Sequence, residues 1–257
     1  MARQTWLKGA ALVVMVALVL SGCSKKAEAQ EGGSGGGASG GGSSQSTARA
    51  NPVSDFRYVL TDDGSGIKIT LYTGMSQGGS GITDVVIPST IEDMPVLELE
   101  GFGGARITSI VIPNSVKIIG TQAFRDLRIT SIVIPDSVEI IWNSAFSGCR
   151  ELASVTLPNS LKIIGDSAFR YNPKLTSINL PASIEWIGSN AFAACGELTN
   201  LVIPDSLTRI KWGNNLQPSS YPRLQESSFS LTSFDGCQKL PIRTRQRLQE
   251  LGYTGKF

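Results

Sequence analysis

The chain of 257 residues contains no histidine, and only 7% of its residues are aromatic and 17% charged. The absence of histidine excludes Ser-His and Cys-His nucleophile pairs, histidine general bases and histidine metal ligands. The formal net charge is +2, so the sequence lacks the basic excess that is typical of nucleic-acid binding. These absences argue against an enzyme, and the sequence indicates no metal ion, no cofactor and no nucleic-acid partner.

Residues 1–22 have the pattern of a secretory signal. A positively charged start precedes an apolar run over 9–20, which is too short to cross a bilayer of about 30 Å as a helix. The run ends in the tetrad Leu-Ser-Gly-Cys at 20–23, which resembles the bacterial lipobox. This resemblance implies cleavage before Cys23 and attachment of lipid to its thiol. Ser24, where an Asp would resemble an inner-membrane retention signal, favours the outer membrane or the cell surface. An ordinary secretory signal that ends near a cysteine is the alternative.

Residues 23–52 are expected to form a lipid-anchored flexible linker. Glycine and serine dominate this stretch from 32 to 46, where no apolar side chain is larger than that of Ala38. Such a segment cannot bury enough surface to offset its conformational entropy. The linker therefore separates the folded part of the chain from the membrane.

Beyond the linker the sequence repeats itself. Prolines recur at 88, 113, 135, 158, 181 and 204, with spacings of 25, 22, 23, 23 and 23 residues. A period near 23 falls within the range of roughly 20–29 residues that is typical of leucine-rich repeats. The pattern predicts a mainly β solenoid over 81–212, built from short parallel strands in about six repeats of about 23 residues.

The copy at 129–151 shows what one repeat does. Ile132 and Ile134 alternate with outward residues, as in a short strand, and Pro135 ends the strand because it has no N–H to donate. A second extended stretch follows, and the next turn directs Phe146 inward. No unit can bury these groups alone, so successive copies stack. The equivalent phenylalanines are then expected to form one core column: Phe102, Phe124, Phe146, Phe169 and Phe192.

Stacking also places equivalent surface residues side by side. The outward strand positions are small, neutral and rich in hydroxyl groups, and they suit a flat protein or glycan surface better than a deep small-molecule pocket. These candidate binding residues are Val111, Val133, Thr156, Asn179 and Val202.

A column of residues that alternates in charge is expected to set the register of the coils rather than to bind a partner. Its members are Lys117, Glu139, Lys162 and Glu185.

A second candidate surface is an apolar column beside the inward isoleucines, expected to be at least partly exposed. Its members are Ile118, Ile140, Ile163 and Trp186, with Trp142 at a position where other copies have glycine. An exposed apolar stripe often marks a partner surface. Simple packing under the turns is the alternative.

The repeat pattern L-T-S-I-x-I-P-x-S-V-x-x-I-G-x-x-A-F-x-x-C resembles the BspA-like, Treponema-type leucine-rich repeat over about 82–251. The resemblance implies a secreted or surface protein of bacterial type, with no shared catalytic residues. It also implies adhesion, which several members perform. The sequence departs from the pattern at Trp142 and in the loss of cysteine from the copies that contain Asp126 and Asn172.

Both ends of the array are predicted to carry caps. Residues 53–80 contain two stretches of alternating apolar and polar residues on either side of a turn. This pattern predicts a β-hairpin cap with strands over 56–60 and 67–72. Residues 233–257 predict a terminal repeat remnant and a capping helix, which begins at Pro241 and ends before Gly252. This helix is expected to dock Ile242, Leu248 and Leu251 on the last repeat.

The insertion at 213–232 interrupts the repeat. A long loop in a regular array is often functional, and Tyr221 and Arg223 are its candidate contact residues. A decayed repeat without a role is the alternative.

The cysteines of the repeats are expected to be buried free thiols. Cys149 and Cys195 occupy the same position two units apart, roughly 10 Å, which exceeds the limit of about 7 Å between the Cα atoms of a disulfide. Cys237 can neighbour Cys195 if the insertion loops out.

The sequence therefore predicts a monomeric, non-enzymatic protein that an N-terminal lipid holds to a membrane. Its partner is an unknown protein or glycan, bound at the cell envelope and with adhesion as one use. The alternative is a periplasm-facing structural scaffold that binds other envelope components.

Overall fold

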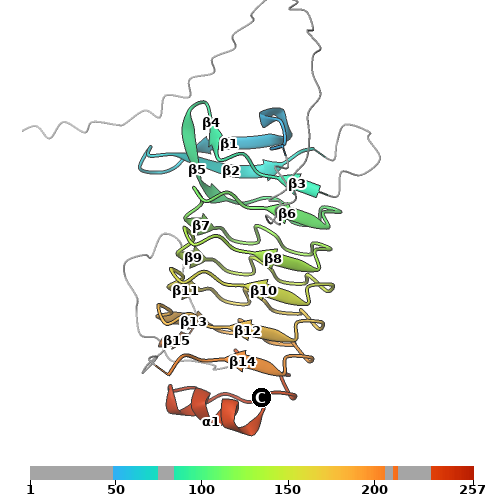
Figure 1. The fold of residues 1–257 in the computed structure, drawn as a ribbon, viewed down its shortest axis with the longest axis vertical. Coiled ribbons are helices and arrows are strands. Elements are labelled where there is room, and N and C mark those ends of the chain that lie inside the picture. Colours follow the sequence, from blue (N-terminus) through green and yellow to red (C-terminus); the bar gives the residue numbers. More distant parts are fainter. Residues whose placement is uncertain (1–48, 75–83, 206–210, 214–232) are drawn as a thin grey trace, which may run out of the picture. The chain divides into compact units, whose positions relative to one another are not determined.

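The structure is a computed structural model that describes residues 49–74, 84–205, 211–213 and 233–257. In this part of the chain a short 3-10 helix (Val53–Asp55) leads into a mainly β solenoid. Each coil contributes one short strand to each of two stacks, which lie side by side in Figure 1. The predicted fold, a leucine-rich-repeat solenoid with a cap at each end, is confirmed.

The first stack holds the strands whose outward residues are the candidate surface. Its strands are β3 (Asp84–Val86), β6 (Ser109–Val111), β8 (Ser131–Val133), β10 (Ser154–Thr156), β12 (Ser177–Asn179) and β14 (Asn200–Val202). β3 pairs with β6, and β8 to β14 form a four-stranded parallel sheet. In most of these strands the middle residue alone is buried, because alternate side chains point to opposite faces. A proline two residues after each strand stops it from extending.

The second stack is a longer sheet in which equivalent residues of successive coils pair in register. Its repeat strands are β5 (Met94–Leu99), β7 (Ile118–Ile119), β9 (Ile140–Ile141), β11 (Ile163–Ile164), β13 (Trp186–Gly188) and β15 (Lys211–Gly213). Ile141 pairs with Ile119 on one side and with Ile164 on the other. β4 (Thr90–Ile91) adds an antiparallel hairpin to β5, a feature of the irregular first copy that the repeat pattern does not predict.

The core between the stacks contains the predicted phenylalanine column. Phe102, Phe124, Phe146, Phe169 and Phe192 are all fully buried. Their neighbouring ring centroids lie 5.2 to 5.5 Å apart, close to one coil spacing. Phe234 continues the column at 5.3 Å, although the insertion separates it from Phe192 in sequence. The chain therefore returns to the repeat frame after the insertion.

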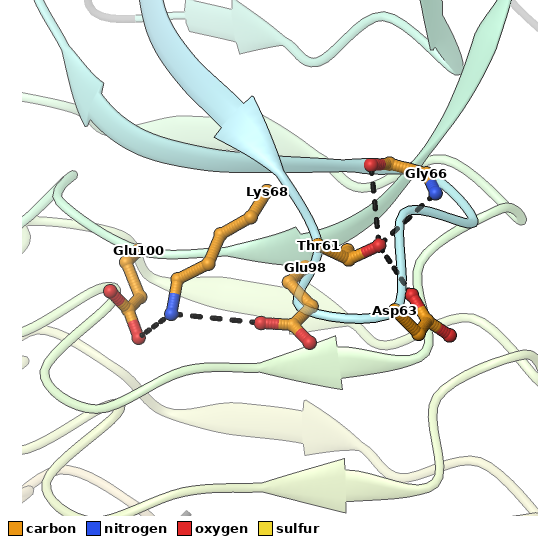
Figure 2. A network of polar contacts seen from close by, with 6 residues as sticks. All are labelled: Thr61, Asp63, Gly66, Lys68, Glu98 and Glu100. Carbon is orange, nitrogen blue, oxygen red and sulfur yellow. Dashed lines mark hydrogen bonds and ion pairs between the residues drawn. The ribbon is translucent and has the colours of Figure 1, made fainter. Parts of the chain in front are cut away.

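A β-hairpin covers the N-terminal end of the core, as predicted. β1 (Phe56–Leu60) pairs antiparallel with β2 (Ile67–Tyr72), and β2 pairs in parallel with β5. Figure 2 shows two sets of polar contacts in this cap, one within the hairpin turn and one around Lys68. In the turn, the Thr61 hydroxyl donates to the Asp63 carboxylate at 2.7 Å and accepts from the Gly66 N–H at 3.1 Å. Lys68 of β2 pairs with Glu100 at 2.8 Å and with Glu98 of β5 at 3.6 Å.

The helix α1 (Ile242–Glu250) covers the other end, directly after Pro241. Gly252 has a φ of +94° and follows the helix with two backbone bonds typical of a Schellman motif, Gly252 N–H to Gln249 and Tyr253 N–H to Leu248. Leu248 and Leu251 are buried as predicted. The prediction for Ile242 is wrong, since it is 73% exposed. It stands in the first turn, on the side that faces away from the core.

Candidate functional site

The outward face of β6, β8, β10, β12 and β14 is an exposed surface with an aligned row of small side chains. Val111, Val133 and Val202 are 49%, 68% and 46% exposed, and Thr156 and Asn179 are also exposed. Thr156 pairs in register with Val133, and Asn179 with Val202, so the row from Val133 to Val202 runs straight across the four-stranded sheet. We call this surface the strand face.

The strand face is almost without charge. Asp84 is the one charged residue in the strands β3, β6, β8, β10, β12 and β14 of this stack. The positions two residues before the row carry serine or asparagine: Ser109, Ser131, Ser154, Ser177 and Asn200. A partner can therefore gain apolar contact with the valines and hydrogen bonds from hydroxyl and amide groups, with little electrostatic attraction.

The apolar column differs from its prediction. Ile140, Ile163, Trp186 and Trp142 are only 3–8% exposed, and Ile118 is partly buried. They form a second apolar cluster, separate from the main core, because in-register pairing brings Ile140, Ile163 and Trp186 together. Trp142 adds its indole ring to the same cluster. The expectation of partial exposure holds for Ile118 and is wrong for the other four side chains, for which the alternative, simple packing, is confirmed.

The column of alternating charge contains a close ion pair. Lys162 Nζ lies 2.6 Å from the Glu139 carboxylate, one coil away. This hydrogen bond holds the pKa of the Glu139 carboxyl below its ordinary value, and Lys117 adds to the effect. Both side chains are about two-fifths exposed, so the pair contributes well under about 1 kcal/mol and serves mainly to align coils.

The cysteines form a buried column of hydrogen bonds. The thiols of Cys149, Cys195 and Cys237 each donate to the carbonyl of a phenylalanine one coil earlier, at 3.1, 3.2 and 3.1 Å. All three are free and buried, as predicted, and Cys237 does follow Cys195 in the column. Burial raises the pKa of the Cys149 and Cys237 thiols to about 12 and raises the pKa of Cys195 as well. Nucleophilic chemistry at these thiols is thereby suppressed.

A hollow of about 710 Å³ opens on the turns that follow β7, β9, β11 and β13. Its polar lining includes Arg125, Arg150, Arg170, Tyr171 and three serines. We call it the turn hollow. Sequence reasoning did not find it, although arginine directly follows the core phenylalanine in two copies, at Arg125 and Arg170.

Several predicted site residues lie outside the described part of the chain, namely Cys23, Tyr221 and Arg223. Among the described residues, no group of three or more Cys, Asp or Glu side chains is placed to hold a metal ion. The same residues include no helix that is long and apolar enough to span a membrane.

The fold and the repeat frame define the protein as a leucine-rich-repeat solenoid. Residues 97–216 match the BspA type Leucine rich repeat region in 6 copies. The resemblance of the repeats to the BspA-type leucine-rich repeat is thereby confirmed.

The chain is similar to several solved structures, and the one from Treponema pallidum supports the same fold. The leucine-rich repeat protein of Treponema pallidum is 29% identical, with a TM-score of 0.59 over 81% of this chain and 99% of that chain. A leucine-rich repeat protein of Bacteroides ovatus is 22% identical, with a TM-score of 0.46 over 72% of this chain and 68% of its own. A leucine rich cell surface protein of Faecalibacterium prausnitzii is 20% identical, with a TM-score of 0.29 over 77% and 82%. Comparison with curated proteins gives no match.

Proposed function

We propose that the protein is a lipid-anchored, non-enzymatic binding module of the bacterial cell envelope, and that its strand face engages a protein partner. The main support for this proposal is the exposed row that contains Val111, Val133 and Val202, because aligned apolar side chains on strands without charged residues suit contact with another macromolecule. A glycan is the second partner class, supported by the serine and asparagine side chains beside the row. The module acts as a monomer, with adhesion as one use of this contact.

The anchor in this proposal is Cys23. The apolar run over 9–20 and the lipobox-like tetrad at 20–23 support lipidation. A single acyl chain binds membranes only marginally, so two or three chains on Cys23 are expected to hold the protein. Mass spectrometry of the processed protein tests this directly. A diacylglyceryl group on an N-terminal Cys23 is the expected result, and an unmodified thiol would contradict it.

Protease treatment of intact cells separates display at the surface from the alternative, a periplasm-facing scaffold. We expect an added protease to digest the protein without lysis, since the strand face must meet its partner outside the cell. Protection until the outer membrane is opened would support the scaffold instead. A periplasmic protein of known location serves as the control for membrane integrity.

A further inference from the structure

The turn hollow contains a tyrosine in an unfavourable backbone conformation. Tyr171 has a φ of +59°, in the left-handed region where a bulky side chain is strained. The equivalent positions on the other coils also have positive φ but carry smaller side chains: Gly104, Asp126, Gly148, Ala194 and Gly236. Their equivalence follows from the ladder of backbone bonds, from Gly148 N–H to Arg170 and from Tyr171 N–H to Ala193. A strained aromatic residue at a position that favours glycine is typical of a functional site.

The ring of Tyr171 is held in place but not buried. The Arg170 guanidinium lies over the ring, 4.3 Å from its centroid, and its Nη2 donates to the Tyr171 hydroxyl at 2.8 Å. Tyr171 nevertheless remains 50% exposed. An aromatic ring fixed in this way at a hollow can stack on a ligand at low entropic cost, since it is already ordered.

The charges around the ring are mainly positive. Arg125, Arg150 and Arg170 line the hollow, together with one carboxylate, Asp126, which pairs with Arg125 at 3.2 Å. The Arg150 guanidinium has no hydrogen-bond or ion-pair partner within the part of the chain that the structure describes. The adjoining hollow adds Arg128 and Glu151, and Glu151 is already paired with Lys174. The guanidinium of Arg150 is therefore available for an anionic ligand group.

The backbone of the turn hollow is not available to a peptide. Apart from Pro173, which has no N–H, every lining residue donates its backbone N–H to a carbonyl of the solenoid. An extended peptide that binds through its main chain needs such donors. Recognition must therefore come from side chains, namely arginine forks, serine hydroxyls and the tyrosine ring.

We propose that the turn hollow binds an acidic saccharide of the uronate type. The sugar ring stacks on Tyr171, its carboxylate pairs with Arg150 and Arg170, and its hydroxyls contact Ser144, Ser147 and Ser167. Carboxylates match the planar donor fork of arginine, and sugars combine an apolar ring face with many hydroxyls. This site is separate from the strand face, so it does not depend on the proposed protein partner.

Glucuronate and glucose form a matched pair of probes, because they differ only in the carboxylate at C6. Each is titrated into the purified full-length protein and followed by calorimetry or by amide chemical shifts. We expect glucuronate to bind at least tenfold more tightly than glucose, and to weaken as salt is raised. Equal affinities, or no binding of glucuronate, would overturn the proposal. So would displacement by an acidic peptide at lower concentration than by glucuronate.

Three variants locate the site. Arg150→Gln should weaken glucuronate binding about tenfold without loss of folding, because Arg150 is exposed and unpaired among the described residues. Tyr171→Gly introduces the residue that the preceding coil carries at Gly148, so we expect an unchanged or higher melting temperature together with lost binding of both sugars. Arg243→Gln removes the same charge from an exposed site on α1 and should leave binding unchanged. Unaltered binding in the first two variants, or equal loss in the third, would contradict the assignment.

Discussion

The ring of Phe146 lies parallel to the ring of Phe169 in the next coil, with 2° between their planes and 5.2 Å between their centroids. Each phenylalanine ring packs against the rings of the coils before and after it, so the column joins consecutive coils into one core. In such a nearest-neighbour array, the removal of one ring weakens the contacts with both adjacent coils.

We therefore expect Phe146→Ala to lower the free energy of unfolding by about 3–5 kcal/mol, the usual loss for a buried phenylalanine. Urea denaturation measures this change. Val133→Ala on the strand face is the control, and it should cost less than about 0.5 kcal/mol because Val133 is exposed. Equal losses in the two variants would contradict the shared core.

Asn172 takes the place of cysteine in the buried column of hydrogen bonds. Its side-chain amide donates to the carbonyls of Phe146 at 3.0 Å and Phe169 at 2.8 Å. Asn172→Ala removes both bonds and should cost about 1–3 kcal/mol. Asn172→Cys should cost less, since a thiol at this position bonds the preceding coil at Cys149 and Cys195. Denaturation of both variants tests this order, and a less stable Cys variant would contradict it.

The three repeat cysteines should not react with Ellman's reagent in the native protein at pH 8. They are fully buried, and burial holds their pKa far above this pH. In denaturant we expect three reactive thiols per processed chain, because the chain has 4 cysteines and a lipidated Cys23 has no free thiol. Rapid reaction of the native protein would contradict the burial. Four thiols in denaturant would contradict lipidation.

The turn of the N-terminal hairpin predicts a pH dependence. The Ser65 N–H, the Thr61 hydroxyl and the Ser65 hydroxyl hydrogen-bond the Asp63 carboxylate and lower its pKa from 3.8 to about 2. A carboxyl with a lowered native pKa stabilises the fold at pH values above its unfolded pKa, and this contribution is lost as the pH falls through the native pKa. Asp63 should therefore contribute fully above about pH 4 and lose its contribution towards pH 2. Melting temperatures over this range should fall less steeply in Asp63→Asn than in the parent chain, and identical slopes would contradict the account.

The fold was predictable from the sequence because identical residues recur at a fixed period. The spacing alone aligns Phe124 with Phe146 and so predicts a shared column. Local patterns also predict both caps, since Pro241 and Gly252 bound the helix. The β4–β5 hairpin was not predictable, because it lies in the first copy, whose spacing departs from the others.

The surfaces were less predictable because exposure depends on packing beyond one repeat. Periodicity shows that Ile140 points away from Ile141, but not that Ile140 is buried against Ile163 and Trp186. The turn hollow also arises only when three coils stack, since Arg125, Arg150 and Arg170 come from three different copies. The outward valines were identified because strand alternation alone determines their direction.

Site-specific photo-crosslinking in producing cells tests the proposed binding face most directly. A photoreactive amino acid replaces Val133 on the strand face or, as a matched exposed apolar control, Ile242 on α1. We predict a discrete crosslinked product from position 133, repeated from position 156, and none from position 242. No product from the strand face, or equal products from the strand face and the helix, would contradict the account.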